Sequence, residues 1–352
     1  MKKIALVSFS NNYDMQEYLY TLYEDMKELE NEVITLGSSK VITNTDICKE
    51  NILINSPDRP GIEIKTFNIR ELIKVLGILR KVDVIYFISS HVWNLIIIRL
   101  LKNKVKIIHT VHDPFPHENE KSTKNIEKYN RFICNQIFNI VLHNKEYKDK
   151  FKNYYNYKGN LYCVPLWRKW KNYDNKDRWE KNILFFGRVN PYKGIHLVEK
   201  FAEELKDYNF YIVGKFSEES KVYKEILMKY ENVIIKDDYI EVKEMEEVFT
   251  NADLVILPYI SATQSGVVVE AYRHSRTVVA FDVGALAEQI ENGISGYLVE
   301  RMNTEDFTDK IKKYFNLSEK EKKKLSKRAW EYGKEIFSTD TIIKVIGEIL
   351  RL

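Results

Sequence analysis

The chain has 352 residues and carries 55 Lys and Arg against 51 Asp and Glu, so its formal charge is +4. This length favours two domains, and the near balance of charge argues against a dedicated nucleic-acid binder. The longest apolar run, Leu95–Leu101, is interrupted by Arg99 and is far shorter than the ~20 residues of a membrane span.

Charge is divided unevenly between the two halves of the chain. Residues 1–170 hold 26 basic and 19 acidic residues, a charge of +7, whereas residues 171–352 hold 29 and 32, a charge of −3. The three cysteines, Cys48, Cys134 and Cys163, are too scattered for a disulfide framework or a zinc site. We therefore expect a cytoplasmic protein whose basic N-terminal domain has the charge for peripheral contact with the inner membrane face.

Short apolar runs alternate with amphipathic stretches in the first half. Several runs are apolar without alternation, which is typical of strands buried on both faces. The predicted strands are Ile4–Phe9, Val33–Leu36, Ile62–Phe67, Val82–Ile88, Val105–Val111, Ile137–Leu142 and Leu161–Val164, with helices over Met15–Leu29 and Ile69–Leu79. Repeated strand and helix pairs predict a doubly wound parallel sheet.

The polar, aromatic stretch Trp167–Lys176 interrupts this pattern and is interpreted as the connection between domains. The pattern then restarts. The second set of predicted strands is Ile183–Phe186, Phe210–Val213, Val233–Ile235, Leu254–Leu257, Val278–Phe281 and Tyr297–Val299, with helices over Ile195–Lys206, Glu219–Lys229, Glu241–Asn251 and Gly266–His274. The last stretch, Ser318–Leu352, is also helical in pattern.

These patterns predict an α/β chain of two Rossmann-like domains, residues 1–168 and 169–335. A C-terminal helix over 336–352 is expected to pack back on the first domain. If the two doubly wound sheets face a central cleft, ligands bind outside the carboxyl ends of the strands. The residues of interest should then lie immediately after strands.

The first such segment, Gly187–Gly194, follows the strand that ends at Phe186. Gly187 permits close approach of the backbone, and Arg188 and Lys193 flank a turn that leads into a helix. Two cations beside a helix N-terminus suit a diphosphate. The alternative is a pair of solvated surface cations.

The second segment, Pro258–Ala271, passes from a buried strand through a small polar loop into a helix that begins near Gly266. Free N–H groups of Ser265, Gly266 and Val267 would point at an anion or at sugar hydroxyls. Glu270 lies about one turn into the helix, where it could accept hydrogen bonds from a ribose diol. The alternative is an ordinary exposed helix glutamate.

Together these segments resemble the retaining GT-B-fold glycosyltransferases of family 4, the group 1 type. The resemblance runs over most of the chain and is densest in residues 183–300. Its pieces, specific only in combination and in this order, are Gly187–Gly194, Ala252–Pro258, Glu270–Ala271, Val283–Glu288 and Asn292–Gly296.

The resemblance implies a role for each matching residue. Arg188 and Lys193 would hold the nucleotide diphosphate and neutralise the departing group, and Glu270 would bind the donor ribose. The remaining donor contacts would be Gly187, Thr263, Gln264, Ser265, Gly266 and Val267, with Tyr239 and Ile240 lining the base. The nucleotide sugar, UDP-linked in preference to GDP-linked, is a substrate, and neither cofactor nor metal is implied.

In the first domain, the strand Val105–Val111 ends at His112 and Asp113. The resemblance places this histidine beside the anomeric centre, and we expect His112 to be catalytic by polarising or positioning. A capping histidine in a Pro-rich turn is the alternative. His112, Asp113 and His117 could also suggest a metal, but Pro114 and Pro116 fix an extended turn, and we expect none. His91 and Asn11 are weaker candidates for acceptor contacts.

The chain also departs from the family pattern at two places. Ala262 stands where many members have the first Glu of Glu-x7-Glu, and Ser8–Tyr13 lacks the glycine-rich loop that shapes the acceptor site in many relatives. The leading hypothesis is a retaining transferase in cell-surface polysaccharide biosynthesis that extends a glycan, lipid-linked in many relatives. The alternatives are a degenerate GT-B subunit that binds donor for an active partner, a GT-B sugar-nucleotide epimerase, and a phosphorylase-like enzyme.

Overall fold

The computed structural model describes residues 2–26, 32–41, 51–57, 68–115, 123–174, 176 and 179–351. Two compact units make up the chain. The first consists of Met1–Lys169 and Ser338–Leu352, and the second of Trp170–Phe337. The predicted strand Ile62–Phe67 and the metal candidate His117 lie outside the described residues.

The first unit is built on a seven-stranded parallel sheet in the order β3-β2-β1-β4-β5-β6-β7. Its strands are β1 (Lys3–Val7), β2 (Glu32–Ser38), β3 (Ile52–Ile54), β4 (Val84–Phe87), β5 (Lys106–Thr110), β6 (Asn139–Leu142) and β7 (Asn160–Cys163). Sequence analysis missed β3, because three residues are too few to show a period.

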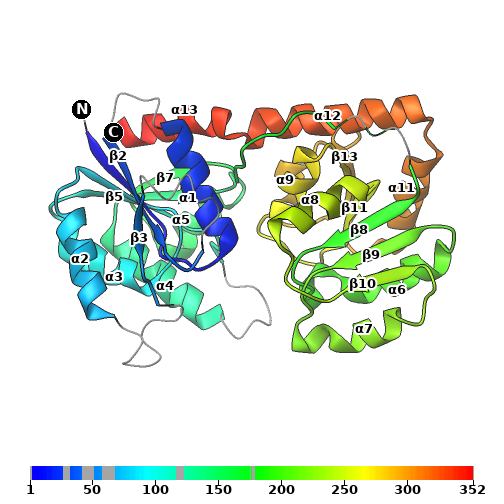
Figure 1. The fold of residues 1–352 in the computed structure, drawn as a ribbon, viewed down its shortest axis with the longest axis horizontal. Helices are drawn as coiled ribbons and strands as arrows, with labels where there is room; N and C mark the ends of the chain where they lie inside the picture. The colour runs from blue at the N-terminus through cyan, green and yellow to red at the C-terminus, as the bar shows by residue number, and fades with distance from the viewer. Residues whose placement is uncertain are drawn as a thin grey trace. The chain divides into compact units, whose positions relative to one another are not determined.

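The helices of this unit cover both faces of the sheet. They are α1 (Tyr13–Met26), α2 (Ile69–Leu79), α3 (Val92–Leu101), α4 (Thr123–Gln136), α5 (Tyr147–Tyr155) and α13 (Thr339–Arg351). Helix α1 connects β1 to β2 on one side of it in the sheet, whereas α2 connects β3 to β4, which lies on the other side of β1. Because both crossovers are right-handed, α1 and α2 lie on opposite faces of the sheet. Side chains of α2 to α5 pack together in one apolar core, and α13 packs beside α1 (Figure 1).

The second unit repeats the arrangement with a six-stranded parallel sheet in the order β10-β9-β8-β11-β12-β13. Its strands are β8 (Asn182–Phe186), β9 (Asn209–Val213), β10 (Val233–Lys236), β11 (Leu254–Leu257), β12 (Thr277–Asp282) and β13 (Gly296–Glu300). All six coincide with predicted strands. These are the strands whose apolar runs are bounded by polar turns.

The helices of the second unit are η3 (Pro191–Lys193), α6 (Ile195–Glu204), η4 (Glu218–Ser220), α7 (Lys221–Leu227), α8 (Val242–Asn251), α9 (Gly266–Arg273), α10 (Leu286–Gln289), α11 (Thr304–Asn316) and α12 (Glu319–Phe337). Helices α6 and α11 pack together, with the rings of Phe201 and Phe307 stacked at 4.9 Å. Helix α12 packs against α9 and β12. The final helical stretch is therefore two helices, of which only α13 belongs to the first unit.

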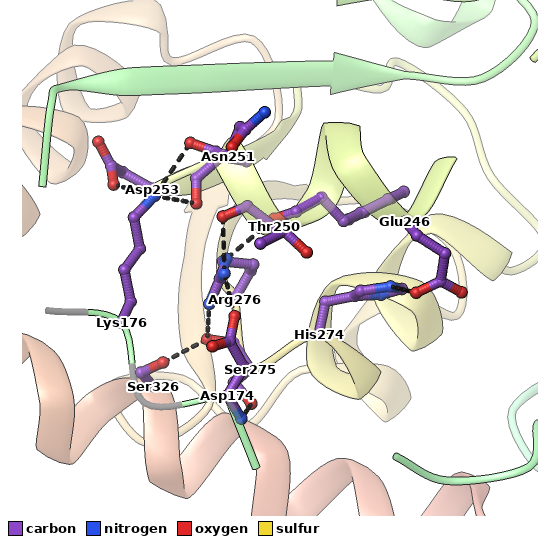
Figure 2. Close-up of polar contacts among 12 residues, drawn as sticks. Asp174, Lys176, Glu246, Thr250, Asn251, Asp253, His274, Ser275, Arg276 and Ser326 are labelled. Carbon is purple, nitrogen blue, oxygen red and sulfur yellow. Dashed lines mark hydrogen bonds and ion pairs between the residues drawn. The ribbon is translucent and has the colours of Figure 1, made fainter. Parts of the chain in front are cut away.

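The segment after Trp170 is anchored to the second unit by buried charges (Figure 2). Arg276 is buried and donates to the carbonyl oxygens of Phe249 and Thr250, at 2.9 and 2.8 Å, and pairs with Asp174. Lys176 pairs with the buried Asp253, whose other oxygen accepts from two backbone N–H groups. These contacts attach Asp174 and Lys176, from a stretch without periodicity, to the second unit.

Each sheet has one point where the strand order reverses. In the first unit this point lies between β1 and β4, and in the second between β8 and β11. In open α/β sheets, ligands bind outside the carboxyl ends of the strands at such a point. Segments 8–16 and 88–91 therefore flank the candidate site of the first unit, and segments 187–194 and 258–267 that of the second.

Candidate functional site

The loop after β8 is held close to its neighbours by glycines. Gly194 has φ +76°, and a Cβ there would lie 1.8 Å from the carbonyl oxygen of Pro258. Gly187 has φ +99°, and its Cβ would lie 2.8 Å from Nζ of Lys193. Both positions favour glycine for conformation, and Gly194 requires it also for space, because its neighbour is backbone. The loops after β8 and β11 thus meet at the switch point, where Ile260 N–H also donates to the Tyr192 carbonyl.

The two predicted cations of this loop lie in different environments. Lys193 is 9% exposed, with Nζ 5.1 Å from the centre of the Tyr259 ring and 3.5 Å from the Phe186 carbonyl oxygen. Arg188 is exposed, and among the described residues its side chain has no hydrogen-bond or ion-pair partner. Lys193 is therefore held in place, whereas the guanidinium of Arg188 remains available to an anion.

The loop after β11 corrects one prediction. The N–H of Ser265 is not free, because it donates to Oε1 of Gln289 at 2.7 Å, and Gln289 Nε2 donates back to the Ser265 carbonyl at 3.1 Å. Gly266 and Val267 begin α9, so their N–H groups belong to the helix N-terminus. A Cβ on Gly266 would meet nothing within 4 Å. Thr263 is buried and Gln264 half-buried in the same loop.

Glu270 is 4% exposed, so its interpretation as an ordinary exposed glutamate is wrong. Its Oε2 lies 3.0 Å from the guanidinium of Arg273 and 3.7 Å from Nδ1 of His274. The His274 Nδ1 donates to the Glu270 carbonyl at 2.8 Å. Burial lowers the pKa of His274 to about 4, although its Nε2 lies 2.9 Å from Oε2 of Glu246. Arg273 is the cation that pairs with the Glu270 carboxylate.

The predicted base-lining residues lie between β10 and α8. Tyr239 is 75% exposed and Ile240 is half-buried. A pocket of about 250 Å³ lies nearby, between α8 and the sheet, lined in part by Leu184, Tyr211 and Val213. Neither Tyr239 nor Ile240 lines it. Tyr239 therefore projects from the surface of the unit, which is where a stacking side chain must be to meet a base.

In the first unit, hydroxyls and amides fill the switch point. Ser8 and Ser89, which follow β1 and β4, share a hydrogen bond of 2.9 Å. Gln16 of α1 is buried and donates to the carbonyls of Ser8 and Ser10, while its Oε1 accepts from the Ser38 N–H at 3.2 Å. Gln16 thereby orders a loop that has no glycines.

The predicted acceptor contact Asn11 takes part in the same network, because its Oδ1 accepts from the hydroxyls of Ser38 and Ser56. This side chain therefore has a structural role in addition to any contact with ligand. The network is also a reason why a glycine-rich loop is not needed here: the side chains of Gln16 and Asn11 satisfy backbone and hydroxyl groups that would otherwise be unpaired.

His91 lies at the edge of a second pocket of about 250 Å³, lined also by Ser90, Asp113, Tyr129 and Asn130. Its Nδ1 accepts from the Trp93 N–H and its Nε2 lies 3.1 Å from the Pro57 carbonyl, which it can reach only as an N–H donor. Burial lowers the pKa of His91 to about 4. His91 is therefore a neutral wall of the pocket, and both its ring nitrogens already have partners.

His112 is also engaged. Its Nε2 lies 2.7 Å from the Ile88 carbonyl oxygen, and its Nδ1 lies 2.9 Å from Nε2 of His143. Burial lowers its pKa. Sequence analysis placed His112 at the end of β5, and the structure shows it there, but with its ring nitrogens turned to the protein. Within the described residues, no group of three or more His, Cys, Asp or Glu side chains could hold a metal ion.

Several residues of these sites were missed by sequence analysis. They are Gln16, Tyr129 and His143 in the first unit, and Arg273 and Gln289 in the second. His143 carried a usable signal, because it directly follows a predicted strand. The glutamines and Tyr129 carried none, because a polar residue in a helix looks exposed until its neighbours are known.

The fold defines the class first: two parallel-sheet Rossmann-like units are the GT-B fold. The solved structure of HepE from Anabaena in complex with UDP-glucose has a TM-score of 0.76 to this chain, with 14% identity and full coverage of both chains. Residues 180–316 match the family model "Glycosyl transferases group 1". This match lies wholly within the second unit.

Two curated relatives agree with that family. An uncharacterised glycosyltransferase of Methanocaldococcus jannaschii is 30% identical over 174 residues, which are 47% of this chain and 46% of the relative. The poly(ribitol-phosphate) alpha-N-acetylglucosaminyltransferase of Staphylococcus aureus is 28% identical over 251 residues, which are 68% of this chain and 49% of the relative. The chain thus aligns with about half the length of each relative.

Proposed function

We propose that this chain is a glycosyltransferase that moves a sugar from a nucleotide-diphosphate sugar, UDP-linked in preference to GDP-linked, to a glycan acceptor. The observation that carries the proposal is the switch point of the second unit. There the buried Lys193 and the exposed Arg188, which has no side-chain partner among the described residues, belong to the loop whose Gly187 lies against Val267 at the N-terminus of α9. Two cations and a helix N-terminus suit a diphosphate. HepE, which shares the fold, binds UDP-glucose.

In the reaction, the bond between the anomeric carbon and the β-phosphate oxygen breaks, and a bond from the acceptor oxygen to the same carbon forms. We propose retention, with attack from the face that the diphosphate leaves and transfer of the acceptor proton to the departing phosphate oxygen. Arg188 and Lys193 stabilise the charge that develops on that oxygen. Glu270 binds the ribose, Tyr239 and Ile240 line the base, and neither metal nor cofactor takes part.

Binding of UDP, GDP, ADP and CMP to the purified chain tests the assignment of the donor site. A ligand that binds only the folded state raises the melting temperature. We expect a shift with UDP that is lost in Arg188→Ala and kept in Arg328→Ala, an exposed arginine on α12 that serves as the matched control. Absence of a shift with every nucleotide would contradict the assignment of the donor site.

The pocket beside His91 supports an acceptor that enters as an uncharged sugar. Its lining offers the hydroxyls and amides of Ser90, Tyr129 and Asn130, and the described lining residues include no Lys or Arg. Such groups bind sugar hydroxyls and give no compensation for a phosphate. Competing acceptors test this: neutral oligosaccharides should be used in preference to sugar phosphates, and Asn130→Leu should raise KM for the acceptor by about tenfold.

We propose peripheral contact with anionic membrane through α2. Ile69 and Ile73, 60% and 63% exposed, lie one turn apart beside Arg70 and Lys74. Such a face binds the boundary of an anionic bilayer, and a lipid-linked glycan would be presented there. None of the described helices is long and apolar enough to cross a membrane. Ile69→Ser with Ile73→Ser should lower sedimentation with anionic vesicles, whereas Val222→Ser, on α7, should not.

One observation favours a second candidate, a subunit that binds donor for an active partner. Ala262, where many relatives have a glutamate, is buried and brings no carboxylate to the loop. Hydrolysis of the bound nucleotide sugar in the absence of acceptor distinguishes the two. Slow hydrolysis that depends on Arg188 supports the transferase, and binding without hydrolysis or transfer supports the subunit.

A further inference from the structure

Four consecutive strand ends of the first unit are linked by two imidazole rings. His112 follows β5 and His143 follows β6, and β5 and β6 are neighbours in the sheet. The rings lie 4.6 Å apart, with His112 Nδ1 2.9 Å from His143 Nε2. The outer nitrogens reach carbonyls after the flanking strands, His112 Nε2 to Ile88 at 2.7 Å and His143 Nδ1 to Val164 at 2.9 Å.

These three contacts require three protons. A carbonyl oxygen only accepts, so each outer contact needs an N–H on the histidine, and the inner nitrogen-to-nitrogen contact needs one more. Two neutral imidazoles carry two N–H groups between them. Every neutral arrangement therefore leaves two lone pairs facing each other at less than 3 Å, whereas a pair with one extra proton satisfies all three contacts. A fourth proton would set two N–H groups against each other.

The surroundings act on the pair in opposite directions. Burial lowers the pKa of both rings, to about 3 for His143, and His112 lowers the pKa of His143 further. Asp113 raises the pKa of both, and Asp14 of α1 raises that of His112. Strongly interacting groups titrate as a pair, with values that belong to neither ring alone.

Neighbouring groups also determine which outer contact of the two histidines can break. Tyr18 of α1 faces His112 at 6.0 Å between ring centres, and Trp167 faces His143 at 6.1 Å. The cation on this side, Arg168, lies over the Tyr18 ring and is paired with Asp14 and Glu17. His109, whose pKa His112 lowers, is buried within β5. His143 is buried and His112 only half-buried. The outer contact that can break is therefore that of His112 with the Ile88 carbonyl.

We propose that His143 is the positioning residue for His112: together the two rings hold one proton more than two neutral imidazoles, and when the pair loses one proton, His143 keeps the inner proton on His112 Nδ1. The proton passes to water, and the His112 Nε2–H bond is the one that breaks. His143 keeps its N–H to Val164 and accepts from His112 Nδ1–H. The lone pair now on His112 Nε2 is repelled by the Ile88 carbonyl and becomes available to a substrate hydroxyl.

Nitrogen-15 NMR of the imidazole rings tests the shared proton without any activity measurement. Single substitutions assign the signals of the seven histidines. We expect His112 and His143 to titrate together in one step, to show coupling across the nitrogen-to-nitrogen contact, and to end at high pH with the proton of His112 on Nδ1. Two independent steps would overturn the proposal, and so would rings that stay neutral from pH 5 to pH 9.

The expected effect on catalysis rests on the proposed transferase function, and it is measured separately as kcat and its dependence on pH. His143→Phe should lower kcat at least tenfold and remove the rise of kcat with pH that accompanies loss of the shared proton. His143→Gln, whose amide can accept from His112 Nδ1, should recover much of kcat without that pH dependence. His196→Gln, in α6 of the other unit, is the control and should change neither.

The two tests separate two kinds of failure. If the rings titrate together but no sugar is transferred under any condition, the transferase proposal fails and the proton sharing stands. If transfer occurs with the same pH profile in wild type and His143→Gln, the positioning role fails and the transferase proposal stands. A melting temperature for each variant shows that it is folded.

Discussion

The two units share one architecture but build their candidate sites differently. In the second unit, the switch point is formed by two short stretches, Gly187–Gly194 and Pro258–Glu270, each contiguous in sequence. In the first unit, it is formed by single side chains from separate strand ends, such as Ser8 and Ser89, and the neighbouring strand ends add His112 and His143. A contiguous motif can be found in a sequence, whereas a site assembled from separate strand ends depends on strand order.

The difference extends to how the loops are held. In the second unit, glycines allow two backbones to touch, as Gly194 does with Pro258. In the first unit, polar side chains bridge the loops, and Gln16 alone satisfies three backbone groups. Both solutions satisfy the backbone at a strand end, but they respond differently to substitution. Added bulk should damage the second unit most, and loss of a hydrogen-bonding group the first.

The largest expected effect is that of Gly194→Ala. A Cβ 1.8 Å from the Pro258 oxygen, at φ +76°, forces the two loops apart, and we expect a loss of about 3 kcal/mol or more in unfolding free energy. Urea denaturation measures it. Gly77→Ala, in α2 where a Cβ meets nothing within 4 Å, is the matched control and should be neutral or stabilise slightly. Equal stability of both variants would contradict the proposed role of the close approach.

Next in size are the two buried glutamines that tie loops in the two units. Gln16→Leu removes the partners of three backbone groups, and Gln289→Leu those of the N–H and carbonyl of Ser265. A buried backbone group left unpaired costs about 1–3 kcal/mol, so we expect losses of about 3 and about 2 kcal/mol in urea denaturation.

Gln136→Leu, whose amide bonds an exposed lysine, is the control for both and should stay within about 0.5 kcal/mol of wild type. Gln289→Leu should also weaken binding of UDP, because it releases the loop before α9. Unchanged UDP affinity would mean that Gln289 does not order the donor loop.

Acid should destabilise the first unit more than the second. Burial lowers the pKa of His91 to about 4 and of His109 to about 3 in the first unit, and of His274 to about 4 in the second. Each takes up its proton near pH 6.5 when unfolded, so the stability it provides is present above that pH. That stability is lost as pH falls toward the folded-state pKa. Each histidine accounts for a loss of about 1.4 kcal/mol per pH unit.

Hydrogen exchange followed by mass spectrometry at pH 7 and pH 5, corrected for intrinsic rates, measures the protection of backbone amides in each unit separately. We expect protection of β4 and β5 to fall before that of β11 and β12. His274→Phe should reduce the acid response of the second unit only. Equal losses in both units would show that the units unfold together or that these histidines are not the cause.

The smallest expected effect is that of Tyr239→Ala. The side chain is 75% exposed, so its removal should leave the unfolding free energy within about 0.5 kcal/mol of wild type. If the ring stacks on the base, UDP affinity should fall about tenfold, since stacking of a base on an aromatic ring is worth about 1–3 kcal/mol. Isothermal titration calorimetry measures it, and Tyr154→Ala, an exposed tyrosine of the first unit, is the control. An unchanged affinity would remove Tyr239 from the site.

Local sequence patterns predict the fold class, the six strands of the second unit and the position of the glycine and cation loop. These features are local: a strand buried on both faces needs an apolar run, and a tight turn needs glycine where φ is positive. The same reasoning placed His112 at the end of a strand. It could not give β3, which is too short for a period, nor the break at Ser338 between α12 and α13.

The pairs of side chains that meet depend on contacts between distant parts of the chain. His112 and His143 are 31 residues apart and touch because β5 and β6 are neighbours. Gln289 reaches Ser265 across 24 residues, and Glu270, for which an exposed helix position was the alternative, is buried and paired with Arg273. Periodicity reports whether a position faces the core, but the partner of a polar group is set by strand order and helix placement, which are properties of the whole fold.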